Sequence, residues 1–262
     1  MASSIQSLQG SNKGVVALVL AGGYNSRMKS KTPKVLHTIC GVPMILYTAH
    51  VLHHLNVPMY IWHRDDGVRT TCMHLPNVYF VKEKEPRGTG DALRTVHSQL
   101  PHDTSTLLTL HGDSSAFFRH ETYQKLLDTH ARANASLTLL TQKVAHISHT
   151  GRIIRDGRGV IVRNEELGDT VCNNCEINTG VCVFRKKWLD GVHSAVGHDL
   201  KGLRSIVDYI ERAHNDGAPI TDVELTDSEE KMHVNTQEEL YNVQNIAMER
   251  IQKGLLHRPD KI

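Results

Sequence analysis

A loop rich in glycines and cations directly follows the first apolar run of the chain. The residues of this loop that could do chemistry are Ala21, Gly22, Gly23, Arg27 and Lys34. Glycines after a strand let backbone N–H groups come close to a phosphate, and the two cations add charge to the same loop. The pattern lacks the Gly-Lys-Ser/Thr of a P-loop, and Asn25 and Met28 stand where a dinucleotide fingerprint needs glycines. We interpret it as a triphosphate-binding loop rather than a flexible surface loop that carries cations.

Other polar residues follow apolar runs but predict little by themselves. Asp113 comes after the run Thr106 to His111, and a lone aspartate after a strand is most often a turn or capping residue. Gly88 and Thr89, taken alone, indicate only the start of a helix that Thr89 would cap. Their chemistry depends on what the rest of the chain places around them.

Cysteine and histidine patterns indicate metal binding only weakly. Cys172 and Cys175 form a CxxC motif with Cys182 further on, but a structural zinc site needs four ligands and no second CxxC occurs. We therefore expect the five cysteines to be reduced thiols. Among 18 histidines, His50 and His54 have the i, i+4 spacing of a metal pair. Because no third ligand is near them in the sequence, we expect ordinary surface histidines.

Alternating strand and helix patterns in the first half of the chain must position these residues. The predicted strands are Val15 to Leu20, Val57 to Trp62, Asn77 to Val81, Thr106 to His111 and Ser136 to Val144. The predicted helices are Pro43 to Leu55, Gly88 to Leu100 and Arg119 to Arg132. This order predicts an α/β fold of Rossmann-like type, a mostly parallel mixed sheet with helices on both faces. Ligands bind beyond the carboxyl ends of such strands, here the loops at residues 21–34, 82–91 and 111–116.

The second half of the chain reads as an extension of the same sheet. Gly151 to Val162 resembles a hairpin, and Ile177 to Phe184 another strand. Helical patterns cover Gly202 to Asn215 and Thr236 to Gly254; Asn235 or Thr236 can cap the second, with Glu238 and Glu239 in its first turn. No interdomain linker or repeat appears. We expect one domain over residues 1–235 and a C-terminal helical tail over 236–262.

Composition and charge exclude several classes of partner. Lysine and arginine number 30 against 28 acidic residues, so no strong field of one sign would hold nucleic acid or an anionic membrane. The run Val15 to Ala21 is far shorter than the ~20 residues of a membrane span. We expect a cytoplasmic protein with small-molecule partners. The oligomeric state is not indicated.

A series of different short motifs extends along nearly the whole chain. They are Val19 to Gly23, Arg27-Met28, Pro33 to His37, Gly41 to Met44, Gly88 to Gly90, Gly112-Asp113, Gly151 to Ile153, Glu176 to Gly180 and Val234-Asn235. This series resembles that of the sugar-1-phosphate nucleotidylyltransferases. Within them it is most similar to the pyrophosphorylase half of the bifunctional bacterial N-acetylglucosamine-1-phosphate uridyltransferases. The hexapeptide repeats of their acetyltransferase half do not occur in the sequence.

The resemblance implies a role for each matching residue. Arg27 and Lys34 would hold the triphosphate and stabilise the departing pyrophosphate, while Asp113 and Asn235 would hold Mg²⁺, which prefers such oxygen ligands. The residues implied in nucleotide binding are Ala21, Gly22, Gly23, Glu83, Gly88 and Thr89. Those implied in sugar binding are Gly151, Glu165, Asn178 and Thr179.

The implied reaction joins a nucleoside triphosphate, most simply UTP, to N-acetylglucosamine 1-phosphate, giving UDP-N-acetylglucosamine, a cell-envelope precursor, and pyrophosphate. A phosphate monoester has its second pKa near ~6, so the nucleophile is already mostly dianionic at neutral pH and no general base is needed. The barrier is repulsion between anions and charge building on the leaving group. Such a reaction needs positioning and cations.

The sequence also departs from the pattern of its apparent relatives. Asn25 replaces a glycine, His111 an aromatic residue, and Ser114-Ser115 a Val-Pro pair. The glutamine that reads uracil in the family is here Glu83. Two alternatives therefore stay open: a cytidylyltransferase or other hexose-1-phosphate nucleotidylyltransferase, and a nucleotide-binding protein without turnover.

Overall fold

A computed structural model of the chain describes residues 12–23, 27–85, 87–113, 117–147, 150–195, 205–232 and 234–259. The chain divides into two compact units. The first comprises residues 1–85, 110–121 and 229–262, and the second residues 86–109 and 122–228. The described residues contain no helix that is long and apolar enough to cross a membrane. The predicted domain boundary at residue 235 stays a prediction.

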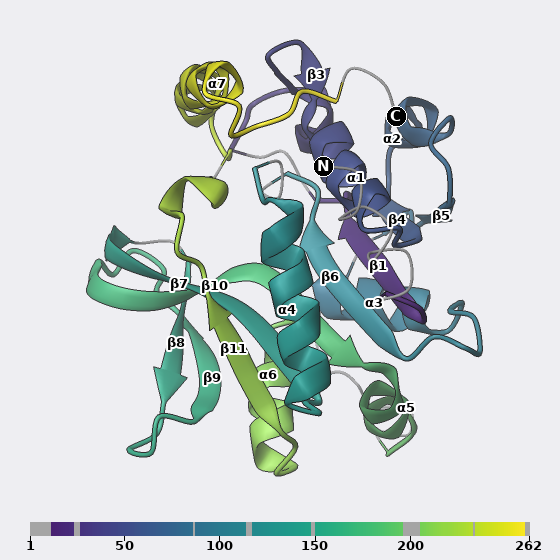
Figure 1. Cartoon of the computed structure of the whole chain (residues 1–262), viewed down its shortest axis with the longest axis vertical. Coiled ribbons are helices and arrows are strands. Elements are labelled where there is room, and N and C mark those ends of the chain that lie inside the picture. Colours follow the sequence, from purple (N-terminus) through teal and green to yellow (C-terminus); the bar gives the residue numbers. More distant parts are fainter. Residues whose placement is uncertain are drawn as a thin grey trace, which may run out of the picture. The chain divides into compact units, whose positions relative to one another are not determined.

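Three parallel strands of the first unit lead into loops that the sequence predicts to bind ligand. They are β1 (Val15–Leu20), β4 (Met59–His63) and β5 (Val78–Lys82), with β4 between the other two. Figure 1 shows the three lying side by side. Every residue of β1 is buried, as a continuous apolar run in a parallel sheet should be. The carboxyl ends of the strands therefore bring residues 21–23, 63 and 83 to one edge.

Helices and a short hairpin complete the first unit. The helices are α1 (Met44–His54), α2 (Asp66–Cys72) and α7 (Gln237–Gln252), with the 3-10 turns η1 (Lys34–Leu36) and η2 (Ser228–Glu230); the hairpin is β2 (Thr38–Ile39) with β3 (Val42–Pro43). Helix α7 begins as predicted. The Thr236 hydroxyl accepts from the N–H of Glu239, and the Glu239 carboxylate accepts from the N–H of Thr236, which forms a capping box.

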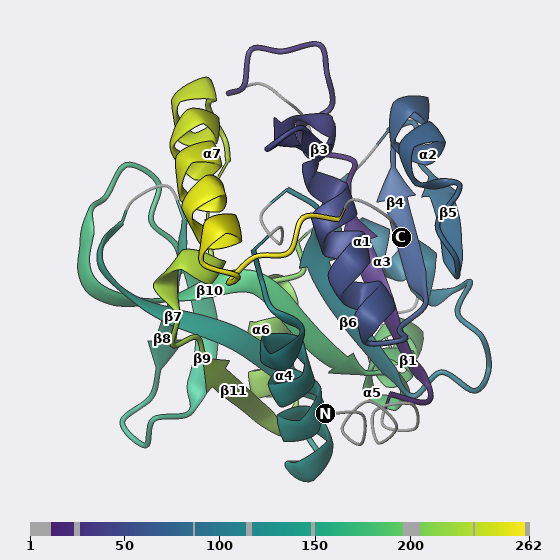
Figure 2. The same cartoon turned by 45° about the horizontal axis from the view of Figure 1, so that its top comes forward.

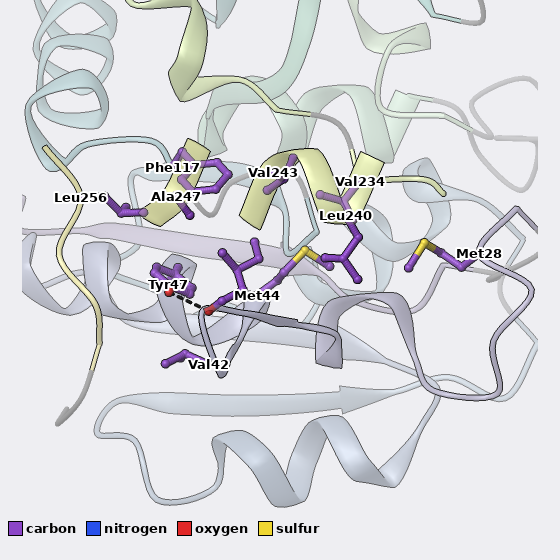
Figure 3. Close-up of a cluster of buried hydrophobic side chains, with 11 residues drawn as sticks. Met28, Val42, Met44, Tyr47, Phe117, Val234, Leu240, Val243, Ala247 and Leu256 are labelled. Atoms are coloured by element: carbon purple, nitrogen blue, oxygen red, sulfur yellow. Dashed lines mark hydrogen bonds between the residues drawn. The ribbon is translucent and has the colours of Figure 1, made fainter. Parts of the chain in front are cut away.

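A hydrophobic cluster holds two segments that carry predicted site residues. Its members include Met28, Met44, Tyr47, Phe117, Val234, Leu240 and Val243. Figure 3 shows these side chains gathered between α1 and α7, with the Tyr47 hydroxyl donating to the carbonyl of Ile39 at 2.9 Å. Met28 follows Arg27 and Val234 precedes Asn235 in the chain. The cluster thus fixes the backbone beside these two polar residues.

The second unit is a mixed sheet with helices. Its strands are β6 (Thr106–His111), of which residues 106–109 lie in this unit, β7 (Leu137–Ile147), β8 (Gly151–Arg155), β9 (Ile161–Glu166), β10 (Cys172–Arg185) and β11 (Ile220–Glu224). Strand β10 is antiparallel to β6, β7 and β8, whereas β11 is parallel to β7. The β8–β9 hairpin extends beside β7 and β10 in Figure 2. The helices are α3 (Thr89–His97), α4 (His120–Arg132), α5 (Lys186–Ala195) and α6 (Asp208–Asn215).

The predicted α/β class with a mixed sheet is confirmed, with differences in detail. Helices α2 and α5 and strand β11 were not predicted. The helix expected from Gly202 begins at Asp208, and residues 201–204 lie outside the described residues. Asn25 and Ser114-Ser115, at which the sequence departs from its relatives, also lie outside them.

The expectation of reduced thiols is wrong at two of the five cysteines. Cys172 and Cys175 form a disulfide, with their Cα atoms 6.0 Å apart. Asn174 between them adopts a left-handed conformation, φ 53°, and this turns the strand so that both side chains meet. Cys40, Cys72 and Cys182 are free thiols, as expected.

A buried histidine in the second unit makes stability depend on pH. His130 is 4% exposed, its Nδ1 lies 2.8 Å from Thr138 Oγ1, and burial, reinforced by Arg185, lowers its pKa to about 4. The unfolded chain binds this proton from about pH 6.5, so stability is complete above that pH and falls as pH drops toward 4. Between pH 7 and 4, we expect the free energy of unfolding to fall by about 3 kcal/mol less in His130→Gln than in the wild type. Urea unfolding at several pH values in that range measures this difference, with His102→Gln, at an exposed histidine, as the control. If the free energy of unfolding of His130→Gln falls with pH in parallel with that of the wild type, the prediction is wrong.

Candidate functional site

The loop after β1 is shaped by a tryptophan from the neighbouring strand. The N–H of Ala21 donates to the carbonyl of Trp62 at 2.8 Å, which continues the β1–β4 pairing into the loop. A Cβ atom on Gly22 would come within 2.5 Å of the Trp62 ring, so only glycine fits there. Gly23 is exposed with open space around it, and Arg27 is exposed in the turn that follows. Backbone and cation are thus both accessible, as the predicted triphosphate loop requires.

One lysine joins the two residues predicted to hold metal. Lys34 Nζ lies 2.5 Å from Asp113 Oδ2 and 2.7 Å from Asn235 Oδ1. Lys34 begins η1 after Pro33, Asp113 follows the end of β6, and Asn235 precedes Thr236, the N-cap of α7. The N–H of Gly112 donates to the carbonyl of Leu20, which fixes Asp113 beside the end of β1. Three segments distant in sequence therefore converge on one ammonium group.

The positions of Asp113 and Asn235 show whether this predicted pair of metal ligands could bind one ion. Asp113 and Asn235 direct oxygen atoms at a common cation, here the Lys34 ammonium, and oxygen ligands are those that Mg²⁺ takes. The described residues contain no cluster of three or more His, Cys, Asp or Glu side chains that could hold a metal ion. Two protein oxygens are nevertheless sufficient for Mg²⁺ when substrate phosphates and water complete its shell. The pair fits such an ion.

Burial and neighbouring charge set the protonation of this cluster. Burial would raise the pKa of the Asp113 carboxyl, but Lys34, His111 and Lys231 together hold that pKa below its usual value. Burial lowers the pKa of His111, so its ring is neutral at pH 7. Burial and Lys34 lower the pKa of Lys231 to about 8 against the opposing attraction of Asp113. The carboxylate is ionised and the lysine stays mostly charged at neutral pH.

Lys231 was not predicted to belong to the site. It lies among charged residues, Glu229-Glu230-Lys231, a pattern typical of a solvated surface. In the structure Lys231 is only 9% exposed. The sequence hints at this burial only through the apolar residues Met232 and Val234 that follow. Val234 belongs to the hydrophobic cluster, and Met232 packs against it.

Glu83 lies at the same strand edge as the glycine loop. Trp62 Nε1 donates to Glu83 Oε2 at 2.6 Å, and the N–H of Glu83 donates to the carbonyl of His63 at 3.0 Å. The Trp62 ring therefore contacts Gly22 on one side and the Glu83 carboxylate on the other. Trp62 is only 3% exposed, and its contact with Glu83 was not predicted from the sequence.

The remaining predicted residues belong to the second unit, where several have structural partners. Gly88 precedes α3, and Thr89, its first residue, accepts from the N–H of Ile206 at 2.9 Å through its hydroxyl. Gly151 begins β8 and is buried. Glu165 on β9 accepts from Arg152 Nε at 2.7 Å, and this contact lowers the pKa of its carboxyl.

Asn178 and Thr179 lie at an irregularity of β10. The register between β10 and β7 shifts between Asn178 and Cys182, and Gly180 there has φ 85°. The Thr179 hydroxyl donates to the carbonyl of Leu140 at 2.8 Å, so its side chain is used within the sheet. Asn178 Nδ2 is buried and, apart from the Cys182 thiol, finds no hydrogen-bond partner in the described structure. Bulges often redirect side chains near sites, and an unsatisfied buried donor fits a polar ligand there.

His50 and His54, the weakly indicated metal pair, are explained by local packing. Their ring centroids are 4.3 Å apart, and His54 Nδ1 lies 2.9 Å from the carbonyl oxygen of His50. Burial lowers the pKa of His50 to about 4, an effect that His54 reinforces. The two rings are tilted by 57° to each other and pack together on α1.

Comparison with known proteins agrees with these features. Residues 17–216 match the family described as the MobA-like NTP transferase domain. A relative named bifunctional protein GlmU, from Syntrophotalea carbinolica, is 32% identical over 92% of this chain and 53% of its own. The chain spans about half the length of the curated relatives it matches.

Solved structures share the fold. A putative glucose-1-phosphate thymidylyltransferase from Bacillus anthracis has a TM-score of 0.74 at 16% identity, over 89% of this chain and 95% of that one. CMP:2-keto-3-deoxy-manno-octonic acid synthetase complexed with CTP has a TM-score of 0.68 at 16% identity, over 90% and 99%. At such identities the likeness concerns the fold alone. The family match is more specific: the chain belongs to the MobA-like NTP transferases and is a nucleotidyltransferase.

Proposed function

We propose that the protein transfers the nucleotidyl group of UTP to N-acetylglucosamine 1-phosphate with release of pyrophosphate, using Mg²⁺. The observation that carries the proposal is the convergence of Asp113 Oδ2 and Asn235 Oδ1 on the Lys34 ammonium. Carboxylate, amide and lysine in one place supply ligands for a divalent cation and a cation for a phosphate chain. A binding protein without turnover has no need of all three.

The chain's own residues would act by positioning and by charge. Backbone N–H groups of the loop at Gly22 and Gly23, with Arg27, would hold the triphosphate in line for attack on its α-phosphorus. Lys34 would move from Asp113 and Asn235 to the phosphates and stabilise charge on the departing pyrophosphate. Held by Asp113 and Asn235, Mg²⁺ would neutralise charge on the phosphates that react.

The residues proposed to bind the sugar belong to the second unit. Asn178, whose buried Nδ2 has no partner besides the Cys182 thiol, is the residue best supported as a sugar ligand. Glu165 would act only after release from Arg152, and Thr179 only through its backbone, because their side chains already have partners. The roles of Gly88, Thr89 and Gly151 stay predictions.

A second candidate, a cytidylyltransferase, is favoured by the Trp62–Glu83 contact. An ionised carboxylate only accepts hydrogen bonds, and Trp62 already occupies one of its oxygens. Uracil presents an acceptor at O4, which a carboxylate repels, whereas cytosine presents an amino donor. UTP fits if backbone groups near Ala21 and Gly88 dominate recognition of the base.

A substrate grid tests the proposal. Pyrophosphate release is measured for four nucleoside triphosphates against several sugar 1-phosphates, with and without Mg²⁺. We expect activity with UTP and N-acetylglucosamine 1-phosphate that requires Mg²⁺. Activity with CTP alone would favour the second candidate, and absence of release with every pair would overturn both.

Base preference gives a sharper prediction at one residue. We expect Glu83→Gln to raise the ratio of kcat/KM for UTP over that for CTP by at least about tenfold, because a mismatched buried pair costs ~1 to 3 kcal/mol. Trp62→Phe, which keeps a ring against Gly22 but releases Glu83, should shift the ratio less. Glu85→Gln, at an exposed neighbour, is the control. An unchanged ratio in Glu83→Gln would show that this residue does not read the base.

A further inference from the structure

A pocket of about 500 Å³ lies in the second unit, beside the start of β6. It is lined by the segment that leads into β6, the end of α4 with the turn after it, the end of β10 and the first turns of α5. Its volume is in the range of pockets that hold small molecules. None of the residues predicted to bind nucleotide, sugar or metal lines this pocket. It therefore shares no residue with the candidate site described above.

Two buried side chains that line the pocket each have a polar atom without a partner. Thr104 is 7% exposed, and its Oγ1 finds no hydrogen-bond partner among the described residues. His130 is 4% exposed, and its Nδ1 is occupied by Thr138 Oγ1 at 2.8 Å, which leaves Nε2 buried and unpartnered. When the Thr138 hydroxyl donates to Nδ1, Nε2 carries the ring proton and is a donor. Because native folds satisfy nearly all buried polar groups, these two atoms indicate a polar ligand.

Cations surround the same pocket. Arg185 Nε donates to the carbonyl of Ala135 at 3.0 Å, and its guanidinium donates to no other residue that the structure describes. Lys186 pairs at 3.0 Å with Asp190, the one carboxylate among the lining residues. Lys187 is exposed and forms no ion pair within the described part of the chain. The charges of Arg185 and Lys187 are therefore left without a counter-charge from the lining of the pocket.

The two lysines also stand where a helix disfavours cations. Lys186 and Lys187 are the first residues of the ten-residue helix α5, whose first turn holds no acidic side chain. The N-terminus of a helix is the positive end of its dipole, and its first N–H groups have no partner within the helix, so it favours an anion. Lysine charge at this position adds to the same preference. Buried polar groups, cations and a helix N-terminus thus meet at one pocket.

We propose that this pocket binds a phosphate group, either as free phosphate or as part of a phosphorylated small molecule. Arg185 and Lys187 would neutralise its charge, and Thr104 and His130 would contact its oxygen atoms. A phosphate monoester has its second pKa near ~6, so at neutral pH it is mostly a dianion, which matches two cations. The inference does not rest on the proposed function, because the pocket contains none of the residues that support that function.

Amide chemical shifts in NMR spectra of the full chain locate the binding event. On titration with inorganic phosphate at constant ionic strength and without Mg²⁺, we expect saturable shifts at the N–H groups of Thr104 and Trp188, the third residue of α5. Shifts at Gly22 and Gly23 report the candidate active site separately. Glycerol 3-phosphate is the second probe. Tighter binding of this ester than of inorganic phosphate would indicate a phosphorylated small molecule, and equal or weaker binding would indicate free phosphate.

Variants test the residues one at a time. Arg185→Gln and Lys187→Gln should each weaken phosphate affinity at the Trp188 amide about tenfold. Arg158→Gln, at an 82% exposed arginine that pairs with Asp156 in the same unit, is the matched control and should leave this affinity unchanged. Because Lys187 is exposed, Lys187→Gln keeps the fold even if Arg185→Gln does not.

Thr104→Val distinguishes a ligand contact from a structural role. Valine keeps the shape of threonine but removes the unpartnered hydroxyl, so Tm without phosphate should be equal or higher. Phosphate stabilises the form that binds it, so the rise in Tm on its addition should be smaller in Thr104→Val than in the wild type. A structural hydroxyl would give the reverse, a lower Tm and an unchanged rise.

Three results would overturn the inference. One is the absence of saturable shifts at Thr104 and Trp188 with both phosphate compounds. Another is wild-type phosphate affinity in folded Lys187→Gln and Arg185→Gln proteins. The third is that sodium chloride produces shifts at these amides as large as those with phosphate, since this would show only a response to ionic strength. Failure of the substrate grid would reject the proposed function and leave these measurements unaffected.

Discussion

Asp113→Ala should lower the turnover number by about a thousandfold or more. In the proposed reaction, the carboxylate is the charged member of the oxygen pair that would hold Mg²⁺, and Asn235 alone is a weak ligand. Asp113→Asn keeps the shape and an oxygen but loses the charge, so it should retain more activity than Asp113→Ala and need more Mg²⁺ for half-maximal rate.

The fold should survive the Asp113→Ala substitution. Asp113 stands at the end of β6 rather than in the core, and its side chain is 20% exposed. Loss of the contact with Lys34 should cost only a few degrees of Tm. Asp66→Ala, which breaks the exposed pair of Asp66 with Lys82 in the same unit, is the matched control and should keep full turnover. Near-normal turnover in a folded Asp113→Ala protein would reject the metal assignment.

Local sequence signals predicted the elements that depend on them. Strand β1 and strand β6 have the predicted bounds, because continuous apolar runs with defined ends suit buried strands. Helix α7 begins where Thr236 and Glu239 form a capping box, a signal complete within four residues. The fold class follows from the order of such elements and needs no long-range information.

Elements without such signals escaped prediction. Helix α2 has seven residues with Gly67 in its first turn, and β11 reads Ile-Thr-Asp-Val-Glu, which is mostly polar. Tertiary contacts stabilise both: β11 pairs with β7 along its whole length. Propensity is a weak guide for elements so short.

Candidate site residues could be predicted from the sequence where they belong to a motif. Residues that only tertiary packing brings to the same place could not. Lys34, Asp113 and Asn235 lie far apart in sequence, and only the resemblance linked them before the structure brought them together. Lys231 has no motif, and its burial depends on how η2 is anchored through Glu230 and Arg119. The disulfide of Cys172 and Cys175 depends on the backbone of Asn174, which the sequence does not reveal.

Replacing Lys34 should separate catalysis from binding. In the proposed reaction, charge on the leaving pyrophosphate grows toward the transition state, so a cation aimed at it contributes more to the rate than to ground-state affinity. We expect Lys34→Gln to lower kcat about 100- to 1000-fold while nucleotide Kd weakens by no more than about tenfold. Arg27→Gln should show the same order of effects, but smaller, because Arg27 is exposed.

The ratio of the two losses is the decisive quantity. Single-turnover rates and equilibrium titration with the nucleotide give kcat and Kd separately for each variant. Lys31→Gln, at an exposed lysine in the same loop, is the matched control and should change neither. Equal losses of rate and affinity in Lys34→Gln and Arg27→Gln would mean that these cations only bind the triphosphate. Since Lys34 also bridges Asp113 and Asn235 before substrate arrives, its removal should in addition leave that oxygen pair open, and Mn²⁺ should bind Lys34→Gln at least as tightly as wild type.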